Sequence, residues 1–116
     1  MYGIIALLAR SEIVKDFRII HQIAESDIQL IHVEAILIDN SRLYIRELIT
    51  FTEDKYAYQW QSKEGKLIIR WDNAPHWNQI DTFPHHKHIS TQDNIQPSER
   101  VTFEQVLDFI KDKIKK

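Results

Sequence analysis

Four of the six histidines in this 116-residue chain lie between residues 70 and 88. Imidazole is the side chain whose ordinary pKa lies closest to neutrality, so it can transfer protons, bind metal ions or sense pH. A stable core does not require histidines to gather in one place. We therefore expect the functional site in this stretch, which contains Arg70, Asp72, Asn73, His76, His85, His86, Lys87 and His88.

Histidines together with cations suit a reaction at a phosphodiester. In metal-free catalysis one histidine removes the 2′-hydroxyl proton and another protonates the leaving oxygen, while cations stabilise the phosphorane. The candidates for proton transfer are His76, His86 and His88. The candidate cations are Arg70 and Lys87.

Two carboxylates are candidates for orienting a histidine. Asp72 lies two residues after Arg70, so both point to one side of a strand and can form an ion pair there, and a plain surface pair is the alternative. Glu47 interrupts an apolar alternation, which predicts a buried carboxylate. A structural ion pair, an outward rotation at a bulge and a site role are all open for Glu47, and we retain it as a candidate. The alternating residues are Leu43, Ile45, Ile49 and Phe51.

A metal ion is the alternative use of the histidines. His86 and His88 are two residues apart, so an extended chain places both imidazoles on one side, where they can chelate zinc with His76 as a third ligand. The chain has no cysteine, which excludes disulfides, thiolate zinc sites and thiol nucleophiles. We expect no metal ion and no other cofactor, with a histidine-bound divalent metal as the alternative.

Four residues are candidates for binding a substrate, namely Tyr58, Asn73, His85 and Lys87. Tyr58 also belongs to an aromatic stripe with Tyr56 and Trp60. Such a stripe is either a platform on which bases stack or part of the core, and strand spacing favours the core.

Length and charge limit the classes of protein. A chain of 116 residues with ordinary apolar content predicts one domain, residues 1–116. A net charge of -2 excludes a protein that coats nucleic acid by charge alone, although a local basic patch is compatible with it. The apolar opening is too short to cross a bilayer and lacks the features of a signal peptide. We expect a cytoplasmic protein without a membrane partner.

The sequence predicts an α+β fold with a helix at each end. Residues 1–10 form the N-terminal helix, and a capping box at Thr102 and Gln105 begins the C-terminal one. Between them we expect a five-stranded antiparallel meander sheet, because the turns are short. A long histidine-rich loop, residues 73–97, lies over one sheet end, with a short strand at 85–89 as an option. The five strands are expected at residues 13–23, 28–38, 43–51, 56–60 and 67–71.

Two strings in the histidine stretch are distinctive: Asp72-Asn73-Ala74-Pro75-His76 and Phe83-Pro84-His85-His86-Lys87-His88. With Asn40-Ser41-x-Leu43 and Arg46-Glu47 upstream, the chain resembles the TumE-like family of bacterial and archaeal toxins. Members commonly carry a second histidine where this chain has Trp77.

The resemblance implies the toxin of a type II toxin–antitoxin system, neutralised by a cognate antitoxin protein and acting on RNA by analogy with other small toxins. We expect an endoribonuclease-like toxin that uses histidine acid–base chemistry. A non-catalytic module that binds protein or nucleic acid and a metal-dependent hydrolase are the alternatives. A homodimer is a further candidate assembly.

Overall fold

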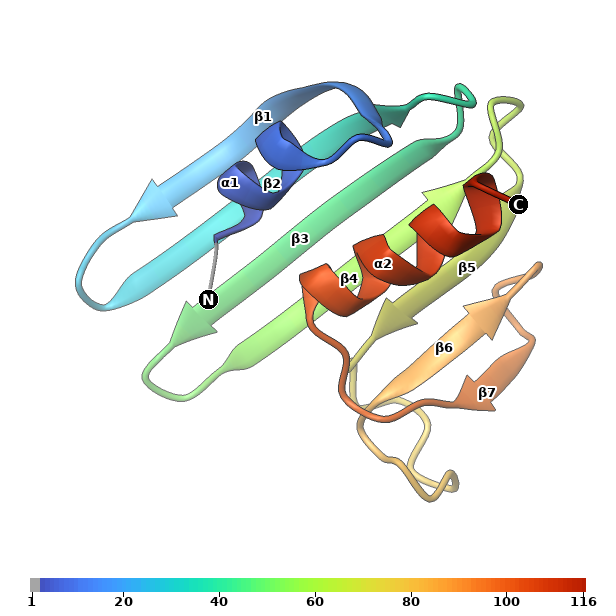
Figure 1. The fold of residues 1–116 in the computed structure, drawn as a ribbon. Coiled ribbons are helices and arrows are strands. Elements are labelled where there is room, and N and C mark those ends of the chain that lie inside the picture. The colour runs from blue at the N-terminus through green and yellow to red at the C-terminus, as the bar shows by residue number, and fades with distance from the viewer. Residues whose placement is uncertain (1–2) are drawn as a thin grey trace.

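The computed structural model describes residues 3–116 as one sheet with two helices. Figure 1 shows the strands lying side by side in chain order. The helices are α1 (Ile4–Arg10) and α2 (Phe103–Ile114). The strands are β1 (Val14–Ala24), β2 (Ile28–Leu37), β3 (Arg42–Thr50), β4 (Asp54–Gln61), β5 (Leu67–Asp72), β6 (His86–Ile89) and β7 (Ile95–Pro97).

The sheet has seven strands, each antiparallel to its neighbours. The first five were predicted to within two residues, and the α+β class and the meander hold, but the prediction of five strands is wrong. β6 pairs with β5, and β7 pairs with β6, so the histidines at 86 and 88 lie within the sheet and not in a loop over its end. Strands of four and three residues are too short to predict from alternation alone, and they form because β5 offers hydrogen bonds to β6 and β6 offers them to β7.

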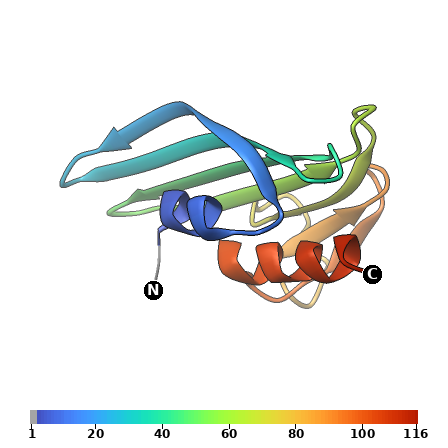
Figure 2. The ribbon, with the colours of Figure 1, turned by 45° about the horizontal axis from the view of Figure 1, so that its top comes forward.

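Both helices cover the same face of the sheet, as Figure 2 shows. The core lies between them and the sheet, and it includes the whole aromatic stripe of β4, which confirms the core interpretation of that stripe. The sheet contributes Val33, Ala35, Leu37, Leu43, Ile45, Tyr56, Tyr58, Trp60 and Trp71, and the helices contribute Ile4, Leu8, Phe103, Val106, Leu107 and Ile110.

The ends of the two helices follow from local sequence. The Thr102 hydroxyl accepts from the Gln105 amide at 3.1 Å, and the Gln105 side chain accepts from the Thr102 amide at 2.9 Å. This capping box begins α2 where it was predicted. α1 begins at Ile4, and the predicted helical residues Met1 and Tyr2 lie outside the described part of the chain.

The β2–β3 turn contains a buried hydroxyl. Asn40 adopts a left-handed conformation with φ of 68°, which asparagine tolerates better than most residues. The Ser41 hydroxyl donates to Asp39 Oδ1 at 2.5 Å and accepts from Trp60 Nε1 at 3.0 Å. The turn therefore supplies the hydrogen-bond partner of a core tryptophan.

Replacing Ser41 with alanine should lower the free energy of unfolding by about 1–3 kcal/mol, because the buried Trp60 N–H loses its acceptor. Urea denaturation measures the change. Ser26→Ala, in the exposed β1–β2 turn, is the matched control and should stay within about 0.5 kcal/mol of the wild type. Equal stability of the two variants would contradict the structural role of the hydroxyl.

Candidate functional site

The face of the sheet turned away from the helices is polar. Residues directly opposite each other in antiparallel strands point to the same side, so the pairing registers define rows across this face. One row runs Glu34, Tyr44, Gln59, Arg70 and His88. The next runs His32, Arg46, Ala57, Asp72 and His86. Residues far apart in the sequence are thereby gathered beside the predicted histidines.

Asp72 is the centre of this arrangement, and 4% of it is exposed. Its Oδ2 accepts from Arg70 Nε at 3.0 Å and lies 3.2 Å from His88 Nε2. Its Oδ1 accepts from the Ala74 amide at 3.0 Å and lies 2.9 Å from His86 Nε2. The predicted ion pair between Arg70 and Asp72 is present, and Asp72 also faces both imidazoles of β6.

The other nitrogen of each imidazole faces a backbone carbonyl. His86 Nδ1 lies 3.0 Å from the Pro84 oxygen, and His88 Nδ1 lies 2.7 Å from the Gln92 oxygen. A carbonyl only accepts, so both Nδ1 atoms carry hydrogen. Only 1% of His86 and 6% of His88 is exposed, which keeps both rings away from any large substrate.

An open groove of about 340 Å³ lies beside this buried cluster. Arg46, Arg70, Asp72 and His76 all line it. A second hollow of about 340 Å³ adjoins it on the same face, and Arg46 and Arg70 line both. Of the three histidines predicted to transfer protons, His76 is the one that is exposed and borders this space.

Three candidates lie on the helix-covered side of the sheet. Lys87 is directly opposite Trp71, so it points away from Asp72. Tyr58 is 2% exposed and packs on Phe103, which leaves no room for a substrate. Its hydroxyl donates to Glu47, and burial followed by this hydrogen bond raises the pKa of Tyr58. Glu47 therefore contacts a core tyrosine and not a histidine.

The remaining two candidates hold loop segments in place. Asn73 accepts from the Tyr56 amide at 3.0 Å and donates to the Asp54 carbonyl at 2.8 Å, which joins the end of β5 to β4. His85 Nδ1 lies 2.9 Å from the Tyr56 hydroxyl, and the rings stack with centroids 5.8 Å apart. Burial, and then the charge of Arg100, lowers the pKa of His85.

Sequence reasoning missed Arg46, His32 and Gln59 as members of this face. Arg46 is exposed and makes no ion pair or side-chain hydrogen bond with any residue that the structure describes. The signal was available, since Arg46 alternates with the buried Ile45 on a predicted strand. What was lacking was the register that places Arg46 in one row with Ala57 and Asp72.

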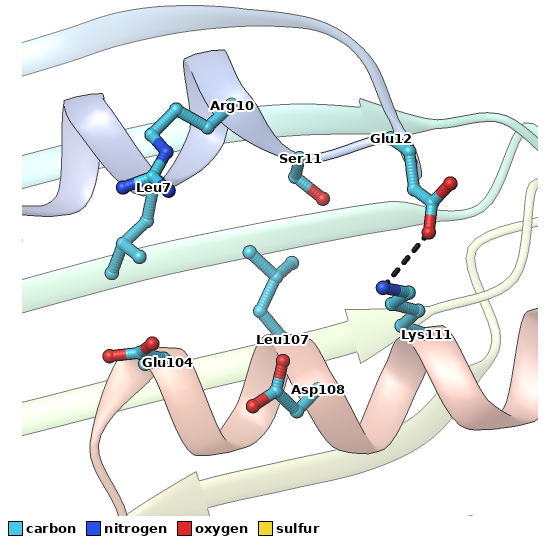
Figure 3. Close-up of a pocket in the computed structure, with 8 residues that line it drawn as sticks. All are labelled: Leu7, Arg10, Ser11, Glu12, Glu104, Leu107, Asp108 and Lys111. Carbon is cyan, nitrogen blue, oxygen red and sulfur yellow. Dashed lines mark ion pairs between the residues drawn. The ribbon is translucent and has the colours of Figure 1, made fainter.

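A different cleft lies between the two helices (Figure 3). Glu12 closes one end of it through an ion pair with Lys111 at 2.9 Å, and Leu107 lies on its wall. No predicted site residue lines this cleft. We therefore place the candidate site on the open face of the sheet.

The family model described as Toxin TumE matches residues 4–114, which is nearly the whole chain. The chain belongs to the TumE toxin family. It is therefore the toxin component of a toxin–antitoxin system, and its partner is a cognate antitoxin. No curated protein and no solved structure matches the chain. Among the described residues of this TumE toxin, neither helix has the length and apolar character needed to span a bilayer.

Replacing Glu47 with glutamine should lower the free energy of unfolding by roughly 1 kcal/mol, because the amide oxygen still accepts from Tyr58 but carries no charge. Growth arrest per folded molecule should not change. Urea denaturation beside a plating assay measures both quantities. A stable Glu47→Gln protein without toxicity would return Glu47 to the functional site.

His86→Ala should lower the free energy of unfolding by about 2–4 kcal/mol, because it opens a cavity and removes a neighbour of the Asp72 carboxylate. His76→Ala, at an exposed position, should stay within about 0.5 kcal/mol of the wild type. Urea denaturation of both proteins checks this. Two variants of equal stability would show that His86 is not a buried structural side chain.

Proposed function

We propose that this toxin acts on RNA and that the groove on the open face binds the RNA backbone. The observation that carries this proposal is Arg70, whose guanidinium is fixed from two sides while it lines the groove. Asp72 accepts from its Nε at 3.0 Å, and Gln59 accepts from its Nη1 at 2.9 Å. A guanidinium fixed in advance binds a phosphate with little loss of side-chain entropy.

The charges of the groove favour an anionic ligand. Arg46, Lys55, Arg70 and His76 line it, and the carboxylate among its lining residues, Asp72, is already occupied by hydrogen-bond donors. Lys55 is paired with Glu53 outside the groove, so Arg46 and Arg70 are the principal cations. The chain as a whole carries a net charge of -2, so this local excess of positive charge distinguishes the groove from the rest of the surface.

His76 is the residue we propose for proton transfer. It is exposed, it lines the groove beside Arg70, and its imidazole has no hydrogen bond or ion pair to another described residue. In this mechanism His76 removes the 2′-hydroxyl proton of the bound RNA, and the 2′-oxygen attacks phosphorus while Arg70 with Arg46 stabilises the phosphorane. The bond from phosphorus to the 5′-oxygen then breaks, and the leaving 5′-oxygen takes its proton from water or from the protonated His76. His86 and His88 act indirectly, because they support the carboxylate that positions Arg70.

The antitoxin in this proposal is a protein, as in type II systems. Covering the open face would neutralise the toxin, because the groove and both arginines lie there. A toxin that binds RNA or protein without cleaving it is the second candidate, and it is favoured by the shallow, open form of the sheet face. The two candidates differ in whether His76 is needed.

His76→Ala should lower the rate of RNA cleavage by about 10²- to 10⁴-fold while RNA affinity is retained. Single-turnover cleavage of end-labelled single-stranded RNA measures the rate, and a 2′,3′-cyclic phosphate on the product identifies attack by the 2′-hydroxyl. Lys63→Ala, in the exposed β4–β5 turn, is the control. Intact RNA in the presence of toxic wild-type protein would overturn the catalytic proposal and leave the binding candidate.

Arg46→Ala should weaken RNA binding for all sequences and reduce the slope of log affinity against log salt by about 0.7, the contribution of one phosphate contact on a single strand. Arg70→Lys keeps the charge but loses the Nε donor to Asp72, so it should weaken binding as well. Filter binding across a salt series measures both. An unchanged slope in Arg46→Ala would remove the groove from the RNA contact.

A further inference from the structure

We infer that Asp72, His86 and His88 form a binding site for one divalent transition-metal ion of the zinc type. Their ligand atoms all lie within 4.8 Å of one another, and all three residues are buried. The inference does not rest on the proposed function, although Asp72 also lines the groove and fixes Arg70 there. The sequence led us to expect no metal ion, and the alternative of a histidine-bound divalent metal used His76 as the third ligand.

The positions of hydrogen on the imidazoles carry the first part of the inference. Both Nδ1 atoms donate to backbone carbonyls, so the Nε2 atom of a neutral ring carries a lone pair. These nitrogens lie 2.9 and 3.2 Å from oxygens of the Asp72 carboxylate, where electron-rich atoms repel one another. A cation between these atoms removes this repulsion, and Nδ1–H bonded to a carbonyl is the arrangement that orients metal-binding histidines.

His86 Nε2 supplies the second part. It is buried, and it has no hydrogen-bond partner among the described residues, although Asp72 Oδ1 lies 2.9 Å away. At that separation the oxygen must lie off the direction in which the nitrogen points. Such a nitrogen is costly to bury unless something other than Asp72 meets its lone pair.

The spacing of the ligands fits a small ion. Bonds of about 2.0–2.1 Å to a tetrahedral zinc ion place neighbouring ligand atoms about 3.3 Å apart. The imidazole–carboxylate distances, 2.9 Å to Oδ1 and 3.2 Å to Oδ2, are close to that value, so both carboxylate oxygens and the two imidazole nitrogens would face the ion.

Burial assigns the ion a structural role. His86 and His88 do not line the groove, and they belong to β6, whereas Asp72 ends β5. The ion would join these two strands behind the carboxylate that fixes Arg70. It would therefore hold the short strand β6 against the sheet.

The test uses the full chain prepared without a histidine tag. Zn²⁺ is titrated by calorimetry, and Co²⁺ is followed by its visible absorption, with the melting temperature recorded at each stage. We expect one ion per chain, tetrahedral Co²⁺ absorption and a melting temperature that rises with Zn²⁺ and falls on chelation. His86→Gln and Asp72→Asn should both lose the stoichiometric site.

His21→Gln is the matched control, because His21 is exposed on β1 and the variant has the same number of histidines as His86→Gln. It should bind the ion as the wild type does. A wild-type protein that neither binds Zn²⁺ nor gains stability from it overturns the inference, as does binding retained in His86→Gln. RNA affinity is measured separately, so failure of the groove and failure of the metal site are distinguishable.

Discussion

A buried carboxylate is stable only when hydrogen-bond donors or cations surround it, and the site contains one such carboxylate, Asp72. Its neighbours come from β5, from the turn that follows β5 and from β6. β6 thus joins the sheet through hydrogen bonds to β5 and also through two imidazoles that face the carboxylate. The position of Arg70, and with it the form of the groove, depends on the same carboxylate.

The two faces of the sheet differ in role: one holds the core and the other holds the candidate site. Both helices pack on one face, so that face holds the core and its aromatic residues are unavailable for binding. The other face carries rows of mostly polar side chains and two adjoining hollows. In such a sheet, neighbouring residues of a strand point to opposite faces, so a shift of one residue moves a side chain from the core to the site. Tyr58 and Ala57 illustrate this, because the first packs under α2 and the second lines the groove.

Periodicity predicted the five long strands, the capped C-terminal helix and the clustering of Arg70, Asp72, His86 and His88 on one stretch. It allowed a strand at residues 85–89 only as an option and did not predict β7, since the existence of both strands depends on pairing with a neighbour rather than on their own composition. It also could not predict that His76 is exposed and His86 is buried, because exposure depends on the tertiary structure. Arg46 shows the same limit: its neighbour across two strands is Asp72, and only the register reveals it.

The order of the strands has a consequence for how the chain comes to be folded during synthesis. Every strand pairs with its neighbour in the sequence, so contacts are local and hairpins can form one after another as the nascent chain emerges. α2 follows all seven strands, however, and the apolar face has no cover over β4 and β5 until it is made. The groove residues are therefore synthesised before the helix that covers the other face of their sheet, and until then apolar surface that can drive aggregation is uncovered.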